Sequence, residues 1–157
     1  STLGSLGAFT PVRAGSDFQL LVAARPSAAE ASEVVHGDLR ARFLAGDSAV
    51  AAGIPLLAEY AVDAAEAYIA GDVEQLGAAM DATFDTRASI IDLVPDHVEM
   101  VEEARAQGAH ANYTGSGGAI VALCPTSSIE AATRQSLKHL GCTVVSVRAT
   151  GPGAHVD

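Results

Sequence analysis

Residues 110–125, HANYTGSGGAIVALCP, place a glycine-rich segment between two stretches of strand-like sequence. The segment TGSGG, residues 114–118, therefore predicts strands at about 109–114 and 119–124 joined by a short connection. A tight hairpin needs only one or two residues with positive φ. Three glycines beside Thr114 and Ser116 leave two interpretations open: an ordinary turn, or a loop whose backbone N–H groups approach an anion.

The hydrophobic pattern of the whole chain gives the order strand, inserted helices, helix, strand, strand, helix, strand. Without the insertion, this is the order of a split βαβ unit. We therefore expect an α+β fold: a ferredoxin-like split βαβ arrangement with a four-stranded antiparallel sheet, helices on one face and an inserted set of helices beside it. The expected elements are a strand at 18–25, helices beginning near residues 28, 48, 72 and 95, the two strands around the glycines, a helix at 127–140 and a strand at 142–149.

Polar residues indicate where several helices begin. Asp47 or the serine after it is expected to cap the longest helix. Asp72 with Gln75 three residues later has the form of a capping box, and so does Ser127 with Glu130.

Apolar residues at helical spacing predict the buried face of two helices. Pro55, inside the longest helix, predicts a kink or a second helix start. The predicted faces are Val50, Ile54, Leu57, Ala61, Ala64 and Tyr68 in the longest helix, and Val98, Val101 and Arg105 in the helix that begins at Pro95.

Composition restricts the class of protein. The 157 residues suffice for one domain with a real core, and a net charge of −10 with scattered basic residues argues against nucleic acid as a partner. No continuous apolar run approaches the roughly 20 residues that span a bilayer, so we expect a cytoplasmic protein with no membrane partner. Cys124 and Cys142 lie in apolar runs and are expected to be buried thiols, with no metal site.

The ends of the chain differ in composition from its centre. Residues 1–17 are rich in Gly, Ser and Thr and begin with Ser1, which indicates a linker or a cut edge. Residues 18–150 form the expected domain, and residues 151–157 form an expected flexible tail.

Known phosphate-loop patterns do not fit the glycine segment. No G-x-x-x-x-G-K-[ST] occurs, and Ile120 stands where G-x-G-x-x-G requires its third glycine. Instead, NYTGSGGAIVALCP, together with FDTRASI and HVEMVEEARAQGAHA before it, resembles the C-terminal glycine motif of the GHMP kinase superfamily, most of all its glucuronokinase-like and mevalonate kinase-like branches. The resemblance covers about residues 18–150.

The resemblance implies the C-terminal domain of an ATP-dependent kinase for a sugar or sugar acid. In that family an N-terminal domain with a G-L-G-S-S-type loop binds most of the ATP and Mg²⁺, and no such loop occurs in this chain. We therefore expect the chain to be inactive without an N-terminal partner domain, and its catalytic residues are unknown. The alternative is a non-catalytic ferredoxin-like module for ligand binding or dimerisation, and a homodimer is expected in either case.

Candidate site residues follow from the matching motif. The loop proposed to lie near phosphate and substrate consists of Thr114, Gly115, Ser116, Gly117 and Gly118. Arg87 suits a carboxylate or phosphate, although the sequence alone favours a surface arginine in an ion pair with Asp81 or Asp85. His36 is a second candidate for a substrate contact, whereas His97 and the remaining histidines are interpreted as structural or exposed.

Overall fold

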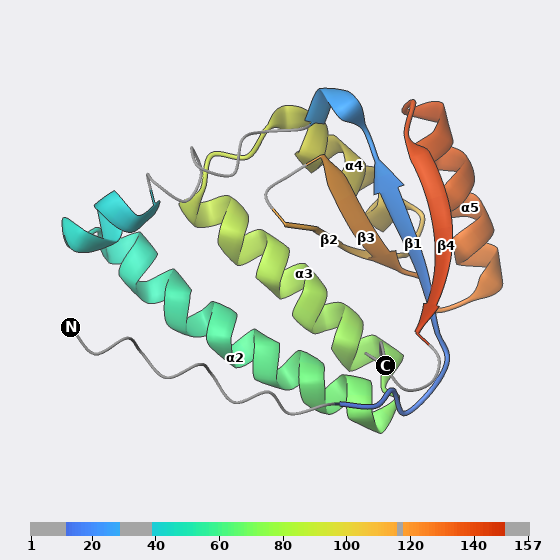
Figure 1. Ribbon diagram of the computed structural model, residues 1–157, viewed down its shortest axis with the longest axis horizontal. Helices are drawn as coiled ribbons and strands as arrows, with labels where there is room; N and C mark the ends of the chain where they lie inside the picture. The colour runs from blue at the N-terminus through green and yellow to red at the C-terminus, as the bar shows by residue number, and fades with distance from the viewer. Residues whose placement is uncertain (1–11, 29–38, 116–117, 150–157) are drawn as a thin grey trace, which may run out of the picture.

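The computed structural model describes residues 12–28, 39–115 and 118–149 of the chain (Figure 1). Its centre is a four-stranded sheet in the order β2-β3-β1-β4, in which every neighbouring pair is antiparallel. The predicted α+β, ferredoxin-like arrangement is confirmed. The strands are β1 (Phe18–Ala24), β2 (His110–Tyr113), β3 (Ala119–Leu123) and β4 (Thr143–Ala149).

Helices cover one face of the sheet and one of its edges. In Figure 1, α4 and α5 lie behind the sheet, and the hairpin of α2 and α3 lies beside it, with α3 packed against β2. Residues 39–44 are also helical, whereas most of the helix predicted to begin near residue 28 lies outside the described residues. The elements are η1 (Pro26–Ala28), α2 (Ser48–Ala70), α3 (Val73–Ile90), α4 (Pro95–Ala106) and α5 (Ser127–His139).

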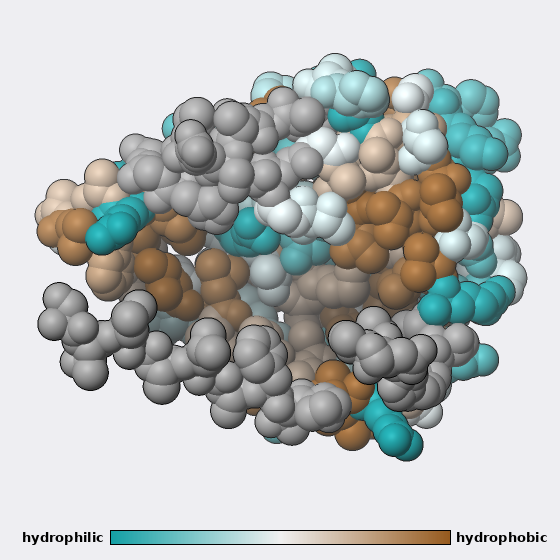
Figure 2. Space-filling model, viewed as in Figure 1, coloured by the Kyte–Doolittle hydropathy of each residue, from teal (hydrophilic) through white to brown (hydrophobic). Residues whose placement is uncertain are grey.

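The main core lies between the sheet and α4 and α5. Strand register explains its composition, because Leu21 pairs with Ala122 and Ala23 pairs with Ile120, which directs these four side chains to the same face. All four are completely buried. The opposite face carries exposed valines of β4, and Figure 2 shows apolar residues gathered over β1 and β4 on this side. The exposed valines are Val145 and Val147.

The helix caps confirm two predictions and correct a third. Asp47 accepts hydrogen bonds from Ala49 N–H and Val50 N–H, and Asp72 accepts one from Gln75 N–H. The cap of α5 is Thr126 rather than Ser127, because Thr126 has the extended backbone of a cap residue and accepts from Ile129 N–H. Serine 127 is instead the first residue of the helix.

The predicted buried face of α2 is right in part: Val50 is buried and Leu57, Ala64 and Tyr68 are partly buried, whereas Ala61 is exposed. The buried residues are Val50, Gly53 and Ala67, whereas Ile54 is 39% exposed. The face against α3 uses small residues because the two helices pack closely, with Gly53 against the side chain of Ile90. Pro55 lies inside a continuous helix and does not mark a second start.

The helix α2 also combines length with apolar composition. Within the described residues, it is the helix whose length and composition would suffice to cross a membrane. It nevertheless carries Glu59, Asp63 and Glu66 and packs along α3. We therefore describe it as a helix of this domain.

Candidate functional site

The glycine loop is closed at its base by the strands on either side of it. Thr114 donates two hydrogen bonds to the carbonyl of Ala119, from its backbone N–H at 2.9 Å and from its hydroxyl at 3.3 Å. Gly115 and Gly118 have φ angles of 57° and 81°, which favour glycine. Ser116 and Gly117 lie outside the described residues.

Arg87 reaches the start of this loop from α3. Its Nη2 donates to the carbonyl of Gly115 at 3.4 Å, and its guanidinium carbon lies 3.9 Å from the centre of the Tyr113 ring. Such a distance is typical of a cation–π contact. Arg87 and the start of the glycine loop, two separate predictions from the sequence, therefore lie together in the structure.

The two acids considered as partners of Arg87 bind a different arginine. Arg105 on α4 contacts Asp81 at 2.9 Å and Asp85 at 2.7 Å. Its Nη2 also donates to the carbonyls of Asp81 and Ala111, so Arg105 links α3, α4 and β2. The sequence placed Arg105 on the apolar stripe of its helix, and the structure explains how it is accommodated there.

His97 lies at the other end of the loop, although it was interpreted from the sequence as structural or exposed. Its ring is 2% exposed, stacks on Tyr113 with 5.7 Å between ring centres, and accepts a hydrogen bond at Nε2 from Gly118 N–H. The predicted face of α4 is right in part: Val101 is buried and Val98 packs against the core, but the buried face also includes His97 and Met100, and Arg105 is only partly buried. A histidine in phase with Val101 was the signal that could have revealed it.

Gly118 is also held through its carbonyl group. Arg25, just after β1, donates its backbone N–H to Gly118 O at 2.9 Å. The Arg25 guanidinium pairs with Glu99 at 2.5 Å and lies 3.6 Å from Asp96, both on α4. The end of β1 and the start of α4 thus meet at the second half of the loop.

One side of the glycine loop is open, and a buried tyrosine lies at its base. Burial raises the pKa of the Tyr113 hydroxyl, and the positive charge of Arg87 opposes this rise. A methyl group added to Gly115 would meet no described atom within 4 Å beyond its chain neighbours, so the loop is open on that side.

The described residues offer no equivalent site for a divalent metal. Residues 12–28, 39–115 and 118–149 contain no group of three His, Cys, Asp or Glu side chains that could hold a metal ion. The described part of the chain therefore provides no three-ligand site for Mg²⁺.

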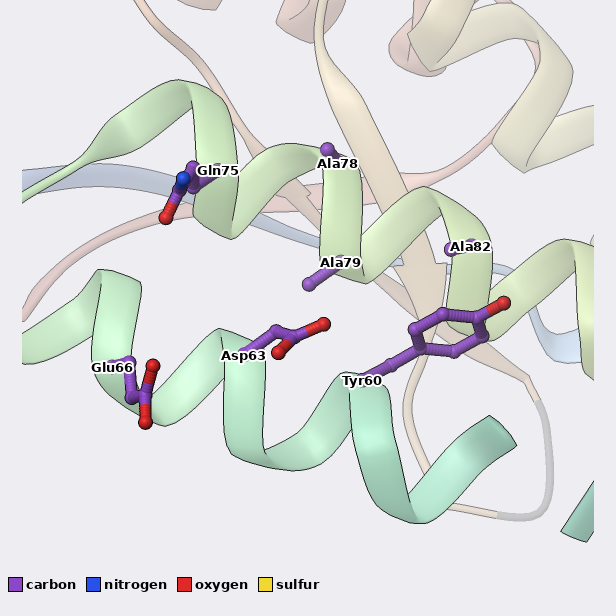
Figure 3. Close-up of a pocket in the computed structure, with 7 residues that line it drawn as sticks. All are labelled: Tyr60, Asp63, Glu66, Gln75, Ala78, Ala79 and Ala82. Carbon is purple, nitrogen blue, oxygen red and sulfur yellow. The ribbon is translucent and has the colours of Figure 1, made fainter. Parts of the chain in front are cut away.

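A separate groove lies between α2 and α3 (Figure 3). Its volume is about 490 Å³, and Asp63 and Glu66 contribute two carboxylates to its wall. These acids disfavour an anionic ligand, so this groove is not the phosphate site that the motif predicts. The remaining lining residues are Tyr60, Gln75, Ala78, Ala79 and Ala82.

Comparison with known proteins agrees with this fold and loop. The family model "GHMP kinases C terminal" matches residues 61–141, so the chain belongs to the GHMP kinase family and comprises its C-terminal domain. The resemblance inferred from the glycine motif is confirmed.

Within this family the sequence is similar to glucuronokinases. It is 38% identical over 94 residues to probable glucuronokinase 2 of Arabidopsis thaliana and 33% identical over 124 residues to glucuronokinase 1 of the same organism. These matches cover 58% and 76% of this chain, but only 26% and 33% of the two relatives. The chain thus spans about a third or less of each relative's length.

Solved structures support the fold. The L. major mevalonate kinase in complex with R-mevalonate superposes with a TM-score of 0.82 at 22% identity, over 94% of this chain and 47% of that one. The Streptococcus pneumoniae phosphomevalonate kinase superposes with a TM-score of 0.70 at 17% identity, over 87% of this chain and 42% of that one. At these identities the likeness concerns the fold alone.

Proposed function

We propose that this chain is the C-terminal domain of an ATP-dependent sugar-acid kinase, in which residues 114–118 and Arg87 lie at the phosphate and substrate site. The supporting observation is the hydrogen bond from Arg87 to Gly115, which places a guanidinium beside the open glycine loop. Similarity to two glucuronokinases favours a substrate with a carboxylate. A guanidinium binds such a group through paired, charge-assisted hydrogen bonds.

The proposed roles follow from the charges. ATP, when bound, supplies the phosphoryl group that is transferred to a substrate hydroxyl. Negative charge on phosphoryl oxygens is stabilised by preorganised donors, and loop amides that make no hydrogen bond within the domain would be donors of this kind. Arg87 would orient the substrate through its carboxylate. His36, the other predicted substrate contact, lies outside the described residues and remains a proposal.

The remainder of the kinase is proposed to bind most of the nucleotide and its Mg²⁺. Since the chain spans only 26% and 33% of its relatives, we propose that it is inactive without that part. Exposed apolar residues of α2 provide a surface on which that part, or a second copy of the chain, could pack. The exposed apolar residues of α2 are Ile54, Leu56, Val62 and Ile69.

We further propose a cytoplasmic location.

The proposal is tested by comparing the 157-residue chain with a longer protein that includes any coding sequence before Ser1. We expect the longer protein to transfer phosphate from ATP to glucuronate and the chain alone to show no turnover. Robust turnover by the chain alone would overturn the proposed dependence on another domain. A longer protein inactive on sugar acids, neutral sugars and mevalonate would overturn the kinase assignment, and ligand binding without transfer would favour the binding-module alternative.

The role of Arg87 is tested in the active protein. Loss of a charge-assisted bond to a carboxylate costs about 1.5–3 kcal/mol, so Arg87→Met should raise the KM for glucuronate about tenfold or more. A neutral sugar should be affected much less. Arg148→Met, at an exposed position on β4, is the matched control and should change neither KM. Equal effects of Arg87→Met on both substrates would contradict recognition of the carboxylate.

A further inference from the structure

The last residue of the glycine loop has both of its backbone groups occupied within the domain. The N–H of Gly118 donates to Nε2 of His97, and its carbonyl accepts from the N–H of Arg25 at 2.9 Å. A backbone N–H whose hydrogen is already donated to an acceptor is not also a free donor to a ligand. The family motif alone includes Gly118 among the residues near phosphate, and the hydrogen bonds give it a different task.

His97 is firmly placed for this contact. Its imidazole is 2% exposed and stacks on Tyr113 at an interplanar angle of 15°. Tyr113 immediately precedes the loop and also contacts the Arg87 guanidinium, which binds Gly115. One cluster of three side chains from α3, α4 and β2 therefore contacts both ends of the loop.

The direction of the hydrogen bond defines the state of the imidazole. Because Gly118 N–H donates to Nε2, that nitrogen carries no proton, and the neutral ring has its proton on Nδ1. A protonated ring would present a second donor to the Gly118 N–H and could not make this bond.

We infer that His97 is a positioning residue: its Nε2 holds Gly118 and thereby fixes the backbone at the end of the glycine loop, while Gly118 itself donates to no ligand. The identity of this ligand as a phosphate or a kinase substrate rests on the proposed function, whereas the hydrogen bond between His97 and Gly118 does not.

The test uses NMR on the 157-residue chain and two substitutions of one residue. His97→Phe keeps a flat ring but removes the acceptor, so the Gly118 amide should exchange with solvent about tenfold faster or more. His97→Gln offers an oxygen acceptor at a similar reach and should restore exchange close to the wild-type rate. His139→Gln, on an exposed position of α5, is the matched control and should change nothing at Gly118.

Two results would overturn the inference. One is a Gly118 exchange rate in His97→Phe equal to that of the wild type, and the other is His97→Gln behaving like His97→Phe. A measurement on the unaltered chain covers the case in which a variant does not fold: a scalar coupling across the hydrogen bond between Gly118 nitrogen and His97 Nε2 should be detected, and its absence counts against the inference.

Activity of the longer protein separates this inference from the proposed function. There, His97→Phe should lower kcat/KM about tenfold and His97→Gln should recover most of it. No phosphotransfer by the longer protein, combined with the expected Gly118 exchange rates, would refute the kinase assignment and leave the positioning role intact. Full phosphotransfer by His97→Phe, with rapid Gly118 exchange, would refute a role of the His97–Gly118 hydrogen bond in activity.

Discussion

Gly77 on α3 is the position at which a single methyl group should have the clearest effect on stability. A Cβ added there would lie 2.1 Å from Cδ2 and 2.3 Å from Cγ of the His110 ring. The ring belongs to β2 and is not free to withdraw, since its Nδ1 lies 2.7 Å from Oδ2 of Asp81 and only 21% of the side chain is exposed. Gly77→Ala therefore forces either overlap or loss of the bond to Asp81.

Two opposing contributions to the free energy of unfolding decide whether Gly77→Ala stabilises or destabilises the protein. Alanine is favoured over glycine in a helix interior by about 1 kcal/mol. Overpacking costs about 1–3 kcal/mol, and loss of the hydrogen bond to Asp81 costs about 1 kcal/mol. We expect Gly77→Ala to lower the free energy of unfolding by about 1–2 kcal/mol. With His110→Ala already present, the overlap is removed, and Gly77→Ala should raise the free energy of unfolding by about 1 kcal/mol.

The assay is urea unfolding of the four proteins of this double-mutant cycle, followed by circular dichroism. The expected interaction energy between the two positions is about 2–3 kcal/mol. Ala78→Gly, at an exposed position of the same helix, is the control and should cost about 1 kcal/mol with or without His110. A stabilising Gly77→Ala in the wild type, or the same change in both backgrounds, would refute the reasoning.

Two further expectations concern ionisable groups. Burial raises the pKa of the Cys124 thiol to about 11 and also raises that of Cys142, so neither should react with Ellman's reagent in the native state at neutral pH, and both should react after unfolding. A rapid native reaction would contradict this. A hydrogen bond from Ser146 and the ion pair with Arg134 lower the pKa of Glu130 below its ordinary 4.5. The stabilisation of the fold by the ionised Glu130 is thus present above pH 4.5 and is lost as the pH falls through the lowered pKa. Glu130→Gln should reduce the free energy of unfolding at neutral pH, and this difference should vanish in acid; a difference independent of pH would argue against it.

Local features of the sequence were sufficient for the element order. The correct predictions include strands β2 and β3, the caps Asp47 and Asp72, and the end of α4 before Gly108. These features depend on interactions between residues close in sequence, which do not require the rest of the fold. The face of α2 could be found in this way only in part, through Val50. Its alanine-rich sequence offers apolar residues in nearly every direction, and only close packing against α3 selects Gly53 and Ala67.

The glycine loop shows the same division at the candidate site. Its place between two strands could be read from residues 110–125, and its membership of a known motif from these residues and the segments before them. Which arginine binds Asp81, and which histidine binds Gly118, depended on how α3 and α4 are rotated against the sheet. That rotation is set by the packing of side chains distant in sequence, so only the tertiary structure assigned Arg105 to the acids and brought Arg87 and His97 to the loop.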